Sequence, residues 1–137
     1  MSSPTFLMPL RMHEDARGKL VSVEGASDLP FEIARVYYII ANPGAARGFH
    51  AHKSLEQLLI CVSGSCTVLV DDGAERREVL LDRPDVGLYD RPLHWLEMRD
   101  FSSDCVLLVL ASAPHEESDY IRDYDEFLAA AHARGAA

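Results

Sequence analysis

The stretch QLLICVSGSCTVLVDDG, residues 57–73, decides the fold class. Two short runs of apolar and β-branched residues, Gln57–Ser63 and Cys66–Val70, flank Gly64. This arrangement predicts consecutive antiparallel strands with a tight connection. The Asp-Asp-Gly that follows has the chemistry of a hairpin turn, and Arg77–Leu81 is then the returning strand.

Outward from this stretch, the same pattern of short strands and turn residues continues in both directions. Such a series, without internal repeats, predicts an all-β fold: a jelly-roll β-sandwich of the cupin class, with a short C-terminal α-helix. At 137 residues we expect one domain, 1–137. The other predicted strands are Val36–Ala41, Gly87–Asp90, His94–Met98 and Cys105–Ala111.

The period of the sequence changes only in the C-terminal tail. Asp123 and Glu126 form a capping box at the start of a helix. The apolar stripe that follows fits one helix face, and Gly135 is expected to end the helix. The alanine-rich end, residues 129–137, is expected to fray. The stripe consists of Tyr124, Phe127, Leu128 and Ala131.

Composition and charge exclude several classes of protein. The formal charge of −9 argues against a nucleic-acid binder, which needs a basic surface, but a few arginines can still bind a small anion. No apolar run is long enough to span a membrane, and Met1–Met12 does not resemble a signal peptide. Cys61, Cys66 and Cys105 lie in apolar runs, so we expect buried free thiols and a cytoplasmic location.

The strongest functional signal is Arg47-Gly48-Phe49-His50-Ala51-His52. Side chains alternate along a strand, so His50 and His52 point to the same face. Two imidazoles on one face of a small barrel can bind a metal or act as an acid–base pair.

The metal hypothesis rests on an approximate match to the first metal-binding motif of cupins, with one extra residue before the last glycine. The second motif is incomplete, because Glu97 stands where a histidine is usual. We therefore expect no catalytic metal and no other cofactor. The residues of the first motif are Gly44, His50, His52, Glu56 and Gly64.

Acid–base chemistry suits the pair better, because histidine both takes and gives protons near neutral pH. A base and an acid are sufficient to move a ketone to the neighbouring carbon through an enediolate, given hydrogen bonds to the oxyanion. Tyr37 and Tyr38 are candidate donors, of which alternation lets only one face inward. Arg47 and Arg17 are candidate partners for an anionic ligand.

The segment from Arg47 to Gln57 resembles the signature of the dTDP-4-keto-6-deoxyglucose 3,4-ketoisomerases, cupin enzymes of deoxysugar biosynthesis. The resemblance covers nearly the whole chain. It includes 17–20 and 29–33 near the start, 62–65, 71–73 and 87–89 in the middle, and 100–102, 109–112 and 117–124 towards the end.

The resemblance implies a homodimeric, metal-independent isomerase that acts on a dTDP-sugar. It implies that His50 and His52 are the catalytic pair, with His52 favoured as the base at C3. The family's active-site tyrosine maps best to Tyr38, with Tyr37 beside it at the substrate. Arg47 and Arg17 become expected nucleotide contacts.

Two departures from the family pattern stand out. Leu96 replaces a histidine common in the family, and Ala46 replaces a second arginine. If the missing histidine lines the sugar pocket, substrate choice or the configuration at C4 differs; if it only packs against a dimer partner, neither changes. A non-catalytic sugar-nucleotide-binding cupin and a metal-dependent cupin enzyme remain the alternatives.

Overall fold

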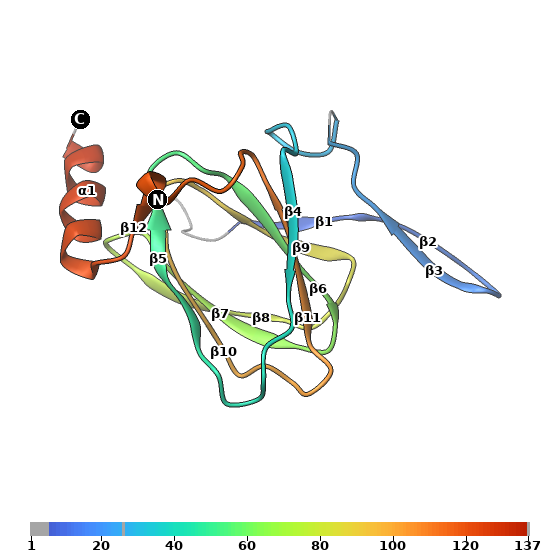
Figure 1. Ribbon diagram of the computed structural model, residues 1–137. Helices are drawn as coiled ribbons and strands as arrows, with labels where there is room; N and C mark the ends of the chain where they lie inside the picture. Colours follow the sequence, from blue (N-terminus) through green and yellow to red (C-terminus); the bar gives the residue numbers. More distant parts are fainter. Residues whose placement is uncertain (1–5, 26, 137) are drawn as a thin grey trace.

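The computed structural model describes residues 6–25 and 27–136. Its strands form two five-stranded antiparallel sheets that face each other, with one helix at the C-terminus (Figure 1). The first sheet has the order β1-β9-β6-β11-β4, the second β12-β5-β10-β7-β8, and β2 and β3 pair separately. The elements are β1 Phe6–Pro9, β2 Arg11–Asp15, β3 Gly18–Ser22, β4 Arg35–Ile39, β5 Arg47–His52, β6 Gln57–Ser63, β7 Cys66–Asp71, β8 Arg76–Leu81, β9 Val86–Asp90, β10 Trp95–Arg99, β11 Val106–Ala111, a 3₁₀ turn Glu117–Asp119, β12 Tyr120–Ile121 and α1 Tyr124–Ala136.

The main core lies between the two sheets. Alternate residues of β6 and β11 meet alternate residues of β7 and β10, as the strand period requires. Full burial of each such side chain contributes about 1.5–3 kcal/mol. The all-β jelly roll expected from the sequence is confirmed. Representative members of this core are Leu59, Val68, Leu96 and Leu107.

One predicted pairing is wrong. Gln57–Ser63 and Cys66–Val70 are both in strands, but β6 pairs with β9 and β11 while β7 pairs with β8 and β10. The chain therefore crosses from one sheet to the other at Gly64. This residue has φ +70°, and a Cβ there would lie 2.9 Å from the Cα of Cys105. A tight turn that looks like a hairpin in the sequence is the corner of the sandwich.

The hairpin predicted at the Asp-Asp-Gly turn is confirmed, since β7 and β8 pair from Cys66↔Leu81 to Asp71↔Arg76. The Gly73 amide donates to the Asp71 carboxylate at 2.8 Å.

The C-terminal helix covers the outer face of the second sheet. Asp123 caps it by accepting from the Glu126 amide at 2.9 Å, as predicted, and the buried Phe127 packs on Trp95. The fraying expected at 129–137 stays a prediction. The helix continues past Gly135 to Ala136, because Ala131 packs on this face and Arg134 donates to the Pro92 carbonyl at 3.0 Å. Residue 137 lies outside the described residues.

The sequence analysis did not predict the N-terminal hairpin. Strands β2 and β3 pair from Asp15↔Gly18 to Arg11↔Ser22 and extend away from the sandwich (Figure 1). Most of their side chains are exposed, so the hairpin has little packing of its own within the chain. Among the described residues, no helix has the length and apolarity needed to cross a membrane.

Candidate active site

The histidine strand β5 reaches its position through unusual backbone at its start. Gly48 has φ +92° and Phe49 φ +58°, and the pairing of β5 with β10 shifts register between Leu96 and Glu97. A Cβ on Gly48 would lie 2.9 Å from the carbonyl oxygen of Leu96, so the close approach of the two strands requires glycine there.

After this irregularity the expected alternation holds. His50 and His52 face the same way, and Ala51 is fully buried on the opposite face, where α1 packs. The helix therefore supports the strand that carries the histidines from behind.

The two imidazoles form a close aromatic group with Tyr120. The His50 and His52 ring centroids are 5.1 Å apart, and the Tyr120 ring lies 5.1 Å from the first and 4.5 Å from the second. Tyr120 belongs to β12, which pairs with β5 opposite His52. The short strand β12 thus places the Tyr120 ring against both imidazoles.

This group lies between two adjoining cavities that share Arg35 and Tyr120. One, of about 390 Å³, is lined by His52 and by residues 112–116 and 118–120. The other, of about 630 Å³, is lined by His50, Tyr37 and Arg47. Each histidine thus faces a cavity large enough for part of a sugar nucleotide.

The surroundings of the histidines favour their neutral forms. Burial, helped by the neighbouring His52 and Arg122, lowers the pKa of His50 to about 4. Burial also lowers the pKa of His52, but the Asp119 carboxylate, 3.4 Å from its Nδ1, opposes this. Because Asp119 stabilises a charged imidazole at position 52, His52 is the stronger base of the two.

The tyrosine positions differ from the expectation. Tyr37 faces the interior, where its hydroxyl donates to the Gln57 side chain at 3.1 Å and the Arg35 guanidinium lies 4.3 Å from its ring centroid. Tyr38 is 64% exposed, although it too is among the residues that line the larger cavity. Side chains alternate between the two faces along β4, so Tyr37 takes the inward-facing position that was expected for Tyr38.

Behind Tyr37 lies a buried polar chain. The Gln57 amide donates to Asp90 at 3.0 Å, and burial raises the pKa of Asp90 to about 8. Burial likewise raises the pKa of Tyr37 to about 12, so its hydroxyl stays protonated and remains a donor.

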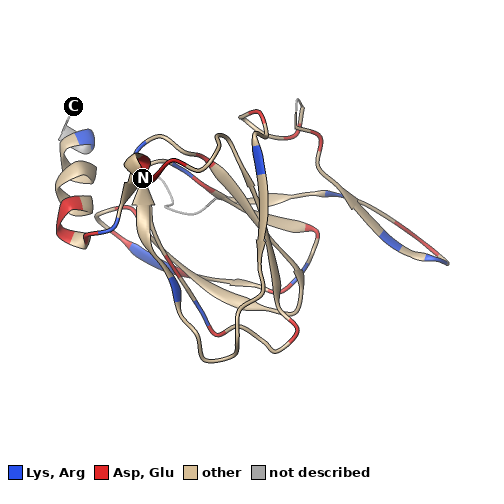
Figure 2. Cartoon of the chain, viewed as in Figure 1, with Lys and Arg blue, Asp and Glu red and all other residues tan. Residues whose placement is uncertain are grey.

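The two predicted arginines lie in different places. Arg47 lines the larger cavity with Arg35 and Arg122, so basic side chains gather at the site although the chain is acidic overall. Figure 2 shows basic and acidic residues interspersed along the chain. Arg17 lies at the tip of the β2–β3 hairpin, paired with Asp15 at 2.6 Å and with its side chain 90% exposed. The chain does not bring Arg17 to its own histidines.

The residues of the approximate metal motif do not converge. Glu56 accepts a hydrogen bond from Tyr89, and Glu97 accepts one from the Trp95 indole at 2.9 Å. Neither carboxylate joins His50 and His52 in a group of three ligands among the described residues. Leu96 pairs with His50 across the strands but is buried in the core and lines neither cavity.

Sequence reasoning missed several residues of the site. They come from the start of β4 and from the segment after β11, which approaches β5 only through the pairing of β12. The resemblance included 117–124, but no motif within it indicated a role for any one side chain. The missed residues are Arg35, His115, Asp119, Tyr120 and Arg122.

A jelly roll with two neighbouring histidines, one half-buried and one buried, beside an arginine-lined cavity defines a cupin-class protein equipped for proton transfer on an anionic ligand. The family described as FdtA: WxcM-like, C-terminal, matches residues 4–132. The chain therefore belongs to this family.

The relatives with established names are consistent with this family assignment. The chain is 57% identical over 114 residues to the TDP-4-oxo-6-deoxy-α-D-glucose-3,4-oxoisomerase of Aneurinibacillus thermoaerophilus, with 82% of each covered. It is 44% identical to the sugar 3,4-ketoisomerase QdtA of Thermoanaerobacterium thermosaccharolyticum, solved with TDP, with 98% of both chains covered and a TM-score of 0.94. The WlaRB TDP-quinovose 3,4-ketoisomerase of Campylobacter jejuni is 48% identical, with 91% of this chain and 97% of that one covered and a TM-score of 0.87.

Proposed function

We propose that the chain is a 3,4-ketoisomerase that converts TDP-4-keto-6-deoxyglucose to a TDP-3-keto-6-deoxyhexose in deoxysugar biosynthesis. The observation that carries the proposal is the histidine pair, half-buried His50 and buried His52, with Asp119 beside the second. The pair lies between two cavities, the larger of which is lined by arginines. A variant of the Thermoanaerobacterium relative, solved with TDP-4-keto-6-deoxyglucose, supports the choice of substrate.

In this proposal His52 removes the proton from C3. The electrons of the C3–H bond form a C3–C4 double bond, and negative charge develops on the oxygen at C4. Asp119 stabilises the imidazolium that His52 becomes. Return of a proton to C4, with loss of the proton from the oxygen at C3, completes the shift of the carbonyl.

His50 and Tyr37 act on the oxygens. The low pKa of His50 keeps it neutral, so it passes a proton between the two oxygens without holding a charge. Tyr37 stays protonated and donates a hydrogen bond to the developing oxyanion. No step requires a metal or a redox cofactor.

The diphosphate is assigned to the arginines of the larger cavity. Arg47, Arg35 and Arg122 line this cavity, and guanidinium groups match phosphate oxygens in pairs. The relative solved with TDP supports thymidine as the nucleoside.

The product identifies the function. Incubation with TDP-4-keto-6-deoxyglucose should yield a 3-keto product, whose C4 coupling constants in a proton NMR spectrum distinguish the galacto from the gluco configuration. UDP-4-keto-6-deoxyglucose at equal concentration tests the nucleoside. An unchanged TDP substrate with folded protein contradicts the proposal.

The rate should depend on pH in a specific direction. Neutral imidazoles are the active form, and burial lowers both histidine pKa values, so kcat/KM should fall on acidification with a midpoint below the ordinary 6.5. Replacing Asp119 with Asn should lower the midpoint further. The folded state prefers neutral histidines, so stability also falls as pH drops below 6.5, and circular dichroism at each pH must show folded protein. A midpoint at or above 6.5 contradicts the assignment.

We also propose a homodimer and a cytoplasmic location, the latter because buried free thiols suit a reducing compartment. The outer face of the first sheet exposes apolar side chains next to an apolar groove of about 350 Å³. Strand β4, which carries some of these exposed side chains, is the edge strand of the first sheet, so its backbone groups are unpaired on one side. A second copy would cover both. The exposed residues include Val36, Tyr38, Ile40 and Val62.

The dimer has a direct test. The purified chain should have twice the chain mass in size-exclusion chromatography with light scattering, and Ile40→Glu should produce monomers because it places a charge in the apolar face. Leu80→Glu is the matched control, since Leu80 is 62% exposed on β8, in the other sheet, and should stay dimeric. Dimers of the Ile40 variant would rule out this face.

A further inference from the structure

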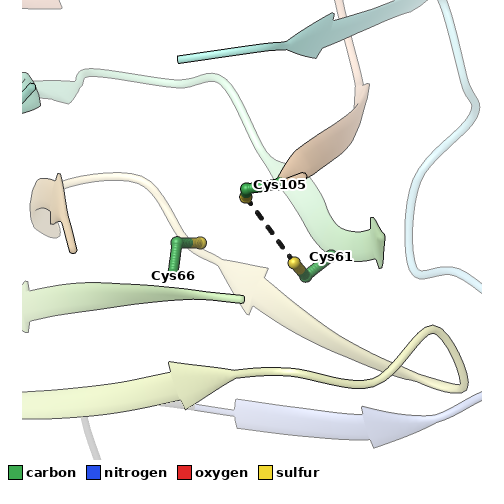
Figure 3. A group of neighbouring side chains, drawn as sticks. All are labelled: Cys61, Cys66 and Cys105. Carbon is green, nitrogen blue, oxygen red and sulfur yellow. Dashed lines mark hydrogen bonds between the residues drawn. The ribbon is translucent and has the colours of Figure 1, made fainter. Parts of the chain in front are cut away.

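Three cysteine side chains meet inside the barrel, away from the histidines. Cys61 comes from β6, Cys66 from the start of β7 and Cys105 from the residue before β11, and all three are at most 2% exposed. Figure 3 shows their sulfurs turned toward one another. The three sulfurs lie within 4.8 Å of one another, and those of Cys61 and Cys105 are 3.8 Å apart.

The cluster is separate from the proposed active site. Along β6, Cys61 is four residues beyond Gln57, the residue that contacts Tyr37. Along β7, Cys66 is four residues before Val70, which shares the register of Leu96 and His50. At a rise of about 3.3 Å per residue, the cysteines lie about 13 Å further along the strands.

The sulfur spacing suits a tetrahedral metal. Zn–S bonds of about 2.3 Å at tetrahedral angles place two sulfurs about 3.8 Å apart. The Cys61–Cys105 separation already has this value, and the 4.8 Å limit leaves Cys66 only a small movement away. Among the described residues, this is the one group of three His, Cys, Asp or Glu side chains with such spacing.

A disulfide accounts for the three-cysteine cluster less completely than a metal ion does. It would pair two of the sulfurs and leave the third thiol beside them, whereas one thiophilic cation uses all three. A cation also offsets the repulsion between thiolates, which burial makes strong. Soft thiolate ligands select zinc and copper(I) over hard cations such as magnesium. With three thiolates, divalent zinc leaves a net charge of −1 in the interior and copper(I) leaves −2, so zinc fits better.

We propose that Cys61, Cys66 and Cys105 form a zinc site with three thiolate ligands and a fourth position for water or a small thiol. The ion ties the two sheets together, since β6 and β11 belong to the first sheet and β7 to the second. It enters past two surface turns, 63–65 and 102–104, that cover the cluster. Its role is to stabilise the end of the sandwich remote from the chemistry.

The test uses the full, tag-free chain, reduced and stripped of metal. Titration with zinc against a chromophoric chelator should give one ion per chain, and cobalt(II) should give sulfur-to-metal charge-transfer absorption. At zinc about 100-fold above Kd, Tm should rise by about 5–10 °C. Cys66→Ser should weaken zinc binding by about 100-fold or more, without changing ketoisomerase turnover.

Val109→Ala is the matched control. Val109 is a buried member of the same core, so the variant is destabilised but keeps three thiols, and it should bind zinc as the wild type does. If Cys66→Ser does not fold, the cobalt(II) form of the wild type decides: the intensity of its charge-transfer absorption should correspond to three thiolate ligands. Less than one zinc per chain, binding unaffected by the cysteine variant, or a disulfide in place of zinc binding would overturn the proposal.

Discussion

Replacing His52 with Asn should reduce kcat by about 10²–10⁴-fold while the protein stays folded, because the variant lacks the base that takes the C3 proton. Asparagine keeps much of the polarity and size of the ring but cannot accept a proton at working pH. The loss should fall on kcat more than on KM, since the proton transfer is made in the transition state. Steady-state kinetics with TDP-4-keto-6-deoxyglucose measure both.

His132→Asn is the matched control for this variant. His132 lies on α1, where its ring contacts the Gly73 carbonyl at 3.0 Å, outside both cavities. This change should leave kcat within about twofold of the wild type, as expected for a surface residue remote from the chemistry. A folded His52 variant with near-wild-type turnover would remove this residue from the mechanism and direct attention to His50.

Replacing Phe127 with Ala should lower the free energy of unfolding by about 3–5 kcal/mol. Phe127 is fully buried between α1 and the outer face of the second sheet, against Trp95 and Ala51. The deletion leaves a cavity behind the histidine strand. Urea unfolding followed by circular dichroism measures the effect, and turnover should also fall because β5 loses its support.

Leu128→Ala is the comparison. Leu128 is only partly buried beside the same cluster, so its loss should be clearly smaller than that of Phe127. Equal losses in the two variants, or an unchanged unfolding midpoint for Phe127→Ala, would show that the helix does not pack on the sheet as described.

Local signals made part of the fold predictable. Gln57–Ser63 is a strand with the expected bounds, and Asp123 caps the helix, because alternation and capping depend on residues close in sequence. Gly64 shows the limit. Its neighbourhood has the composition of a hairpin, but whether two strands pair or separate into opposite sheets depends on their other partners, which lie far along the chain.

The candidate site also has features that the local sequence predicts and features that it does not. The facing of His50 and His52 follows from the strand period, but the choice between Tyr37 and Tyr38 depends on which face of β4 meets the core. Tyr120 reaches the histidines through the pairing of β12 with β5, a contact between segments 68 residues apart at Tyr120↔His52. No local pattern contains that information.

The measurement that tests the central claim most directly is an NMR time course with TDP-4-keto-6-deoxyglucose in D₂O. Proton transfer through an enediolate predicts a 3-keto product with deuterium on C4, since the histidines exchange protons with solvent in open cavities, and recovered substrate labelled at C3. The His52→Asn protein should lose both signals together. A 3-keto product carrying no deuterium at C4, or no product from folded protein, would contradict the account.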